Sequence, residues 1–403
     1  MHFVVFTTIL FSCKKDQEIT KGNIKDTSEE NIEEGYRNDW GKWLSLDQMT
    51  DGTPAVSYYD STTGGLGYAT YKPNEDGDLE WHNEEIDGYV NEQGLDVGDR
   101  GKYSSLAITS TDIPWITYYD VGLKNLRYAT KVPGENGDLE WVTGNADSGG
   151  GSSPNGGLYS SLTLVSDNPV VAHYDNGKGS LRVATWNGSS FSAEVVDDGN
   201  PNDGSDPSDV GKFSAITKDN NNNLYIAYYD MTLGNLKLAW QNASGWQIDV
   251  VDTGNTELEV QLEDGSIATE TVLGNVGAWP SIVIDSNGTI GVSYHDVNNQ
   301  DLKYASKTTT STEWTIETVD TGDLVGADSA LSLQGGYPTI MYFDGRFNNI
   351  KIARKTSGTW TLEKLAGDNE ALGYHNEIIV IDNRHYVACY NYTKKKIWYS
   401  QLD

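Results

Sequence analysis

Cysteine is nearly absent from this chain, and its scarcity excludes one class of fold. Cys13 and Cys389 are the only two among 403 residues, so the chain has no framework of disulfide bonds. Long apolar runs are missing too: no stretch of eighteen apolar residues occurs, so no segment is expected to span a bilayer as a helix. The 24 Tyr and 12 Trp exceed what a disordered chain carries, and we therefore expect a packed core.

Basic residues are also scarce. The chain has 28 Lys and Arg against 59 Asp and Glu, which gives a formal net charge of −31. This charge repels phosphates and argues against nucleic acids and anionic membrane surfaces as partners. It leaves room for a polyanionic sugar that binds at a locally basic position.

Common catalytic signatures are missing as well. The sequence contains no Gly-x-Ser-x-Gly elbow, P-loop, His-Glu-x-x-His or Cys-x-x-Cys motif. A nucleophilic serine, a nucleotide or a zinc-cluster mechanism therefore has no support. Glycoside hydrolysis by a pair of carboxylates stays open, because Asp and Glu are abundant.

The start of the chain predicts an exported lipoprotein. An apolar run ends in Ser12 and Cys13, and the segment "ILFSCKK" resembles a bacterial lipobox. We expect residues 1–13 to be a lipoprotein signal peptide, with Cys13 lipidated and the protein held at the outer membrane on its periplasmic or cell-surface side. An ordinary buried cysteine is the alternative. Residues 14–39 are polar and predict a flexible tether.

One sequence unit recurs seven times with a mean spacing of about 55 residues, which is the signature of a repeat architecture. Each unit has an aromatic pair before an anchor Asp or Asn, and a Leu or Ile follows six residues later. The seven copies are "VSYYDSTTGGLGYA", "ITYYDVGLKNLRYA", "VAHYDNGKGSLRVA", "IAYYDMTLGNLKLA", "VSYHDVNNQDLKYA", "IMYFDGRFNNIKIA" and "VACYNYTKKKIWYS".

Each unit predicts four short strands separated by Gly, Asn and Asp turns, and helical periodicity is missing. Radially repeated four-stranded units predict an all-β, seven-bladed β-propeller of antiparallel blades over residues 40–403. The seventh unit ends after its third strand, and the segment Asn31–Glu34 can supply a fourth strand that closes the ring. An open solenoid is the alternative fold, and we expect a monomer.

Departures from the repeat point to candidate functional residues. Most aromatic pairs and anchors are expected to pack between blades and to cap turns. His173 replaces an aromatic on blade three and His295 replaces one on blade five, and histidine titrates near neutrality. We therefore predict both as catalytic, although a His that only fills a Tyr position is an equal alternative.

Basic residues recur one position after the repeat Leu or Ile. Arg182 near His173 and Lys237 on the next blade can form a local positive patch, and Lys102 and Lys212 open inner strands on the same face. Such a patch suits a carboxylated or sulfated substrate. A solvated charged face is the alternative.

The loop from Asp197 to Asp209 is rich in Asp, Asn and Gly. Its oxygens can hold Ca²⁺, but it lacks the spacing of an EF-hand, and such runs also form ordinary turns. We expect no required cofactor and predict no other metal site.

The Tyr-Tyr-Asp and Leu-Lys-Tyr-Ala repeats resemble those of exported bacterial propellers. In layout, residues 40–403 are similar to the seven-bladed ulvan lyases, which act on a sulfated rhamnose–uronate polysaccharide. In that family a His and a Tyr on neighbouring blades perform acid–base elimination beside an Arg that neutralises the uronate.

By repeat position, this resemblance implies that His173 is the catalytic His, Tyr228 the catalytic Tyr and Tyr294 a further substrate-binding aromatic. Where the family has its Arg on the third strand of blade four, this chain has Lys237, and Arg182 is the substitute.

We therefore expect a carbon–oxygen lyase that eliminates across C4–C5 of a uronate in an acidic, ulvan-like poly- or oligosaccharide, as a lyase or as a dehydratase. Elimination requires neutralisation of the carboxylate, a base for the C5 proton and an acid for the oxygen that leaves C4. A non-catalytic carbohydrate-binding or adhesion propeller is the alternative, and a structural scaffold is the third reading.

Overall fold

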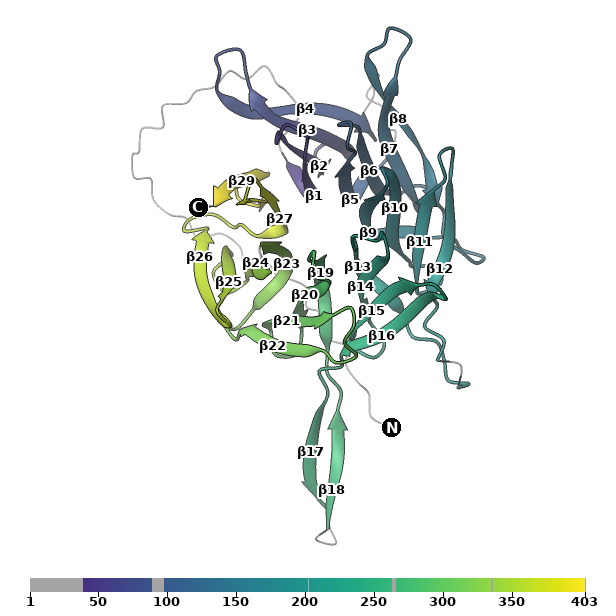
Figure 1. Cartoon of the computed structure of the whole chain (residues 1–403), viewed down its shortest axis with the longest axis vertical. Coiled ribbons are helices and arrows are strands. Elements are labelled where there is room, and N and C mark those ends of the chain that lie inside the picture. Colours follow the sequence, from purple (N-terminus) through teal and green to yellow (C-terminus); the bar gives the residue numbers. More distant parts are fainter. Residues whose placement is uncertain (1–38, 89–97, 202, 263–265, 335, 403) are drawn as a thin grey trace. The chain divides into compact units, whose positions relative to one another are not determined.

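The computed structural model describes residues 39–88, 98–201, 203–262, 266–334 and 336–402, all within the unit Tyr36–Asp403. This part of the chain is all-β and forms the predicted seven-bladed propeller (Figure 1). None of its segments is a helix long and apolar enough to cross a membrane. The predicted lipidation site Cys13 and the predicted closing strand Asn31–Glu34 lie outside the described residues.

Each blade is one antiparallel sheet whose strands pair in sequence order. Blade one is β1 (Trp40–Gln48), β2 (Pro54–Asp60), β3 (Gly65–Pro73) and β4 (Leu79–Asp87). Blade two is β5 (Arg100–Ile108), β6 (Pro114–Asp120), β7 (Asn125–Pro133) and β8 (Leu139–Asp147). Blade three is β9 (Gly156–Val165), β10 (Asn168–Asp175), β11 (Ser180–Trp186) and β12 (Phe191–Asp197). Blade four is β13 (Val210–Lys218), β14 (Leu224–Asp230), β15 (Asn235–Asn242) and β16 (Gly245–Asp252).

The remaining blades follow the same plan. Blade five is β19 (Val276–Ile284), β20 (Thr289–Asp296), β21 (Asp301–Thr308) and β22 (Thr315–Asp320). Blade six is β23 (Val325–Gln334), β24 (Tyr337–Asp344), β25 (Asn349–Thr356) and β26 (Thr359–Ala366). Blade seven has three strands among the described residues, β27 (Tyr374–Ile381), β28 (Arg384–Asn391) and β29 (Lys396–Leu402).

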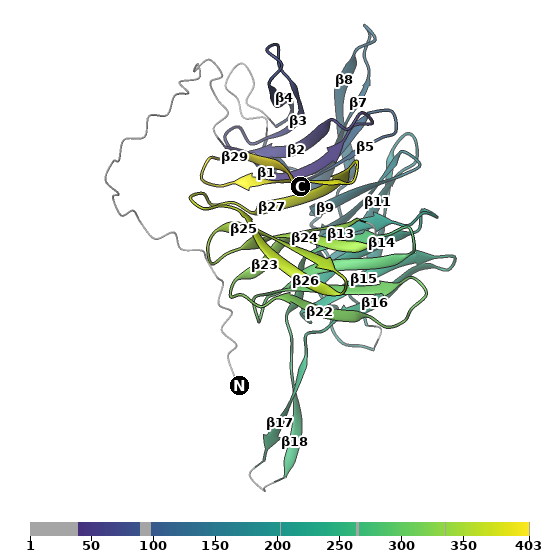
Figure 2. The same cartoon turned by 60° about the vertical axis from the view of Figure 1, so that its left-hand side comes forward.

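The first strand of every blade lines the axis of the propeller. These strands contact one another in ring order, and β27 returns to β1, so the ring is closed rather than an open solenoid (Figures 1 and 2). At the closing seam the Trp40 N–H donates to the Lys395 carbonyl oxygen at 3.0 Å. The Tyr390 hydroxyl, on blade seven, donates to Asp39 at 2.5 Å.

Serine side chains connect the axial strands of neighbouring blades. The hydroxyls of Ser104, Ser160 and Ser214 donate to carbonyl oxygens of the preceding blade at 2.5–2.7 Å. One position further along, the Ser105 and Ser161 hydroxyls accept N–H groups of the following blade at 3.0 and 3.1 Å. Backbone groups that a ring of separate sheets would leave unpaired are thus satisfied.

The repeated anchor residues have the predicted structural role. Asp120 and Asp175 are almost fully buried, and each accepts a backbone N–H of the turn that follows it, at 2.8 and 2.9 Å respectively. Asn391 makes the equivalent bond with Lys394 on blade seven. The aromatic pair and the anchor are therefore parts of the scaffold, as the repeat indicated.

The loop between blades four and five carries an extra hairpin. It consists of β17 (Thr256–Gln261) and β18 (Ile267–Val272), and both views show it projecting from the blades (Figures 1 and 2). Its exposed side chains include Leu258, Val260 and Val272. The hairpin adds no strand to a blade.

A glycine at the start of the axial strand, or just before it on blade seven, permits close approach of two blades. Gly277 of blade five has φ +99°, and a Cβ there would lie 2.6 Å from the Leu236 Cα of blade four. Gly245, the first residue of β16, has nearly the same φ, +103°, but no atom within 4 Å of its ideal Cβ. Both positions share the strain of a positive φ, but only Gly277 is also in contact with a neighbouring blade. Comparing substitutions at the two positions therefore distinguishes the two effects.

We predict that Gly277→Ala lowers the free energy of unfolding by about 1–3 kcal/mol more than Gly245→Ala, because only the first adds a clash to the strained φ. Urea unfolding of the two variants measures the difference. Equal losses would show that contact between blades does not constrain Gly277.

Candidate functional site

Five seams between blades contain the same buried polar triad. An Asp at the end of the outermost strand of one blade accepts hydrogen bonds or ion pairs from a Tyr or His and from an Arg or Lys of the next blade. The triads are Asp87–Tyr118–Arg127, Asp147–His173–Arg182, Asp197–Tyr228–Lys237, Asp252–Tyr294–Lys303 and Asp320–Tyr342–Lys351.

His173 occupies the Tyr position of one triad. Its Nε2 lies 3.1 Å from Asp147 Oδ2, and Arg182 Nε donates to the same oxygen at 2.7 Å. Burial alone would raise the pKa of Asp147, but the hydrogen bonds from His173 and Arg182 outweigh it and hold the pKa well below its usual range. His173 is fully buried, with 0% of its surface exposed.

Tyr228 and Lys237 form the next triad with Asp197. The Tyr228 hydroxyl donates to Asp197 Oδ2 at 2.6 Å, and Lys237 Nζ lies 2.5 Å from the same oxygen. Burial and the Asp197 carboxylate raise the pKa of Tyr228 well above its ordinary value. A general base at neutral pH needs the opposite shift, so this environment does not activate the Tyr228 phenol.

Tyr294 repeats the arrangement, because its buried hydroxyl donates to Asp252 at 2.6 Å beside Lys303. The structure therefore brings His173 near Arg182, and Tyr228 near Lys237, but each pair belongs to a separate seam. The expected positive patch is not formed by these cations, because each is matched by a carboxylate. Their placement favours a scaffold role, and their assignment to catalysis and substrate binding stays a prediction.

Lys102 and Lys212 belong to a second kind of contact between blades. Lys102 pairs with Asp99 at 2.6 Å, and Lys212 pairs with Asp209 at 2.8 Å. The Tyr174 hydroxyl of blade three also donates to Asp209, at 2.7 Å. These lysines are thus part of ion pairs near the start of the axial strands.

His295, the third predicted catalytic residue, lies on β20, the second strand of blade five. Its ring packs against Trp279 with centroids 5.7 Å apart, and burial lowers its pKa. Nothing in the described part of the chain brings His295 and His173 into one site, because they lie on blades five and three.

Among the described residues, blades seven and one depart from the triad pattern. Blade seven has Cys389 and Trp398 at the Tyr and basic positions. On blade one the Tyr58 hydroxyl bonds Asn83 of its own blade at 2.8 Å, and its ring fills the space that a side chain at Gly67 would need.

The axis itself carries a collar of side chains, one from each blade. Five of the seven are aromatic, and neighbouring rings lie 4.6–5.4 Å apart between centroids. The collar consists of Trp43, Tyr103, Tyr159, Phe213, Trp279, Asp328 and His375, all with φ between +46° and +56°. Each such conformation costs about 1–3 kcal/mol for a non-glycine residue, so packing must hold all seven in place.

Asp328 and His375 interrupt the aromatic collar on blades six and seven. The Asp328 carboxylate accepts the backbone N–H of His375, and the His375 ring lies 5.4 Å from the Trp43 ring between centroids. Two residues along the same strand, Glu377 stands where other blades have Ser or Ala. On the axial strand of blade one, the acidic residue Asp47 lies four residues after Trp43.

The environments of these groups separate their pKa values. Burial lowers the pKa of His375 to about 4, with a smaller effect of Lys42, whereas burial and then Asp47 raise the pKa of Glu377 to about 8. Burial raises the pKa of Asp328 to about 6. Three titratable groups whose pKa values are shifted by burial therefore lie on the axial strands of blades six and seven.

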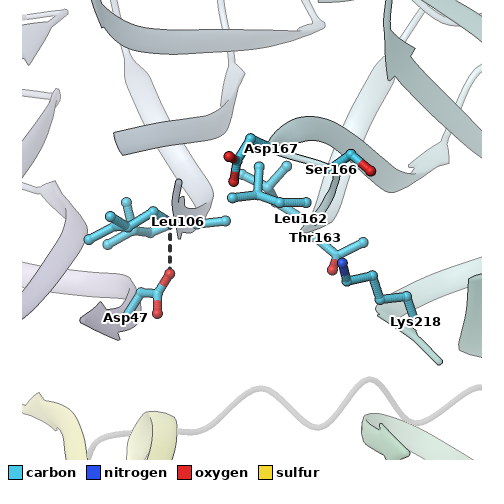
Figure 3. Close-up of a pocket in the computed structure, with 10 residues that line it drawn as sticks. Asp47, Leu106, Leu162, Thr163, Ser166, Asp167 and Lys218 are labelled. Atoms are coloured by element: carbon cyan, nitrogen blue, oxygen red, sulfur yellow. Dashed lines mark hydrogen bonds between the residues drawn. The ribbon is translucent and has the colours of Figure 1, made fainter. Parts of the chain in front are cut away.

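Residues of the axial strands line two pockets of ≈ 490 and ≈ 700 Å³. Asp47 lines both pockets, and no collar residue lines either of them. Figure 3 shows Asp47 and Lys218 on opposite sides of the first pocket. Asp47 accepts the Ile108 N–H at 2.7 Å, which fixes its carboxylate at the wall. The ring of collar residues, on the axial strands, is called the axial site below.

The described residues contain no group of three or more His, Cys, Asp or Glu placed to hold a metal ion. In the loop once expected to hold Ca²⁺, Asp197 and Asp209 are used in contacts between blades, and Asp203 bonds Ser205 at 2.6 Å. The calcium prediction gains no support from this geometry.

The sequence did contain a signal for the collar. The residue sixteen or seventeen positions before each anchor is aromatic in five repeats, and Asp328 and His375 are the two exceptions. His375 is also one of only six His in the chain.

No protein-family model and no curated protein sequence matches the chain. Among solved structures, the polysaccharide lyase Uly1 matches with a TM-score of 0.52 and 10% identity, over 96% of this chain and 93% of that one. A leech intramolecular trans-sialidase matches with a TM-score of 0.45 and 12% identity, over 94% of this chain and 70% of that one. Aleuria aurantia lectin matches with a TM-score of 0.43 and 16% identity, over 81% of this chain and 94% of that one. These neighbours are carbohydrate-active propellers, and at such identities the likeness shows the fold alone.

We predict that Asp197→Ala lowers the free energy of unfolding by about 3–5 kcal/mol, because it leaves the buried Lys237 and Tyr228 without their partner. Asp198→Ala, at the adjacent exposed position, should change it by less than about 0.5 kcal/mol. Lys237 and Tyr228 hold the pKa of Asp197 below its ordinary value against the effect of burial.

The stabilisation by Asp197 is therefore present above its ordinary pKa and lost as the pH falls through the folded pKa. Chemical unfolding at neutral and acidic pH measures both effects. A variant Asp197→Ala as stable as wild type at neutral pH would contradict the scaffold role of the triad.

Proposed function

We propose that this protein is a carbohydrate-active propeller that binds a glycan at the axial site. The observation that carries the proposal is the collar, in which five half-buried aromatic rings are interrupted by Asp328 and His375. Sites for small polar ligands combine aromatic walls with a few placed polar groups. A sugar ring fits this composition, because its C–H faces can lie on aromatic rings while its hydroxyls bond the polar residues.

The substrate that we propose is an acidic poly- or oligosaccharide that contains a uronate, and the reaction is elimination across C4–C5. The similarity of the propeller to a polysaccharide lyase agrees with this choice without carrying it. A leaving sugar would make the protein a lyase, and leaving water would make it a dehydratase. Both reactions produce a 4,5-unsaturated uronate, so one assay detects either.

A lectin-like protein without catalysis is the second candidate. It is favoured by the seams, since His173 and Tyr228, two of the residues predicted to catalyse, are engaged in triads that repeat in blades without a His. Trp43 and Trp279 lie in the collar, so their fluorescence can report binding whether or not a reaction follows.

We expect wild type to release an ultraviolet-absorbing unsaturated uronate from at least one uronate glycan, and the glycan to quench tryptophan fluorescence. His173→Tyr should retain both properties and the stability of wild type, because Tyr makes the same bond to the seam carboxylate in four other blades. Loss of turnover with retained folding would restore His173 as the catalytic base. Quenching without product would leave the lectin-like function, and no binding to any glycan would overturn the proposal.

We also propose that the chain is an exported lipoprotein anchored through Cys13. A lipid chain on this residue would hold the propeller at the outer membrane. In cells that export the full chain, we expect Cys13→Ser to move the protein from the membrane fraction to the soluble fraction, and Cys389→Ser to leave it at the membrane. Membrane association of Cys13→Ser would contradict the anchor.

A further inference from the structure

We propose that the seam between blades four and five holds a second binding site, which takes one neutral sugar unit. The inference takes the class of ligand from the proposed function, but the site is separate from the axial site. It is a pocket of ≈ 370 Å³, called the seam pocket below, and side chains of both blades line it. No residue of the collar or of the triad at this seam lines it. Its volume lies at the lower end of the range for small-molecule sites, about 300–1,000 Å³.

Two other seams are bridged at this position by a glutamate. Between blades one and two, Lys131 donates to one carboxylate oxygen of Glu84 at 2.9 Å, and the Trp141 indole N–H donates to the other at 2.9 Å. Between blades five and six the corresponding distances are 2.5 and 3.1 Å, and the three residues are Glu317, Lys355 and Trp360. One carboxylate therefore joins a Lys and a Trp of the next blade.

Between blades four and five this bridge is incomplete. The strand register places Asp249 at the position of Glu84 and Glu317. Lys307 donates to Asp249 Oδ2 at 2.7 Å, but the Asp side chain is one methylene shorter than Glu. The Trp314 indole N–H is buried and has no hydrogen-bond partner in the part of the chain that the structure describes. Because an unpaired buried donor costs free energy, an acceptor on a ligand would be favoured here.

Two further departures from the repeat shape the seam pocket. Leu238 stands where the bridged blades one and five have Tyr68 and Tyr304, so a smaller side chain fills the seam. Trp240 also lines the pocket, and its indole N–H is a second buried donor without a partner among the described residues. Blades one, two and three have at this position Thr70, Thr130 and Thr185. The scaffold therefore does not require Trp240.

Lys307 and Trp314 are held in place before any ligand binds. The Lys307 side chain is only 8% exposed, and its ammonium group lies 4.8 Å from the centroid of the Trp314 ring. Such a cation–π contact stabilises the position of both groups. The turn that joins β21 to β22 adds hydroxyl groups to the pocket lining, from Thr309, Thr310, Ser311 and Thr312.

The chemistry of the seam pocket fits a sugar ring without a charge. An indole ring can bind the C–H face of a pyranose, and a sugar hydroxyl can accept from an indole N–H while it donates to a carboxylate. Lys307 matches the charge of Asp249, so a uronate or a sulfate in this pocket would lack a counter-ion of its own. The seam pocket thus differs in selectivity from the acidic sugar proposed for the axial site.

The first test closes the seam pocket with a residue from another seam. Asp249→Glu restores the bridge formed by Glu84, so its second carboxylate oxygen takes the Trp314 N–H. Trp240→Thr removes an aromatic wall and copies blades one to three. We expect each variant to lower the affinity for the sugar by about tenfold or more. The unfolding temperature of Asp249→Glu should equal or exceed that of wild type, because a buried donor gains its partner.

The matched control is Asp368→Glu, which makes the same change at an exposed carboxylate paired with Lys364. It should bind the sugar as wild type does. The probes are the methyl glycosides of glucose, galactose, mannose, fucose and rhamnose, and ligand-observed NMR titration measures their affinities. A crystal soaked with the tightest of them should show the sugar against Trp240 and Trp314.

Binding of none of the five glycosides to wild type would overturn the seam pocket. An affinity of Asp249→Glu or Trp240→Thr within about twofold of wild type would overturn it too, since the sugar would then bind elsewhere. Formation of the unsaturated uronate reports on the axial site, and Asp249→Glu should leave it unchanged. Seam binding by a wild-type protein that neither binds nor converts any uronate glycan would therefore overturn the axial proposal and leave the seam pocket.

Discussion

A carboxylate buried between two blades is the interaction on which the propeller depends most. At five seams an outer-strand Asp is held by a phenol or imidazole and by a cation of the next blade, as Asp197 is by Tyr228 and Lys237. Burying these charges costs free energy, and the geometry recovers it only while all partners are present. The three members of a triad therefore depend on one another, which agrees with their recurrence as a set at five seams.

The triads and the axial collar are separate features of the propeller. The seam between blades five and six carries a triad, and blade six still has Asp328 in the collar. Blade seven has Cys389 and Trp398 at the triad positions, and its axial strand has His375 in the collar and Glu377 two residues later. The ring closes beside blade seven through contacts such as that of Tyr390 with Asp39.

The fold was predictable from the sequence, whereas the site was predictable only in part. Seven anchors with a Leu or Ile six residues later determine the blade number, and the turn role of Asp120 follows from its residue type. The seam partner of His173 was not predictable, because Asp147 follows its repeat Leu by 21 residues, whereas Asp197 follows its own by 16. The sequence showed that His173 departs from the repeat, but not that its ring faces a buried carboxylate. Glu377 was hidden among 59 acidic residues, and only its position at the axis gives it a raised pKa.

The most direct test of this account is the crystal structure of the protein with a bound uronate oligosaccharide. The account predicts sugar density at the axis, with one ring against the collar beside Trp43. Density confined to the rim over blades three and four, in contact with a displaced His173 or Tyr228, would contradict it.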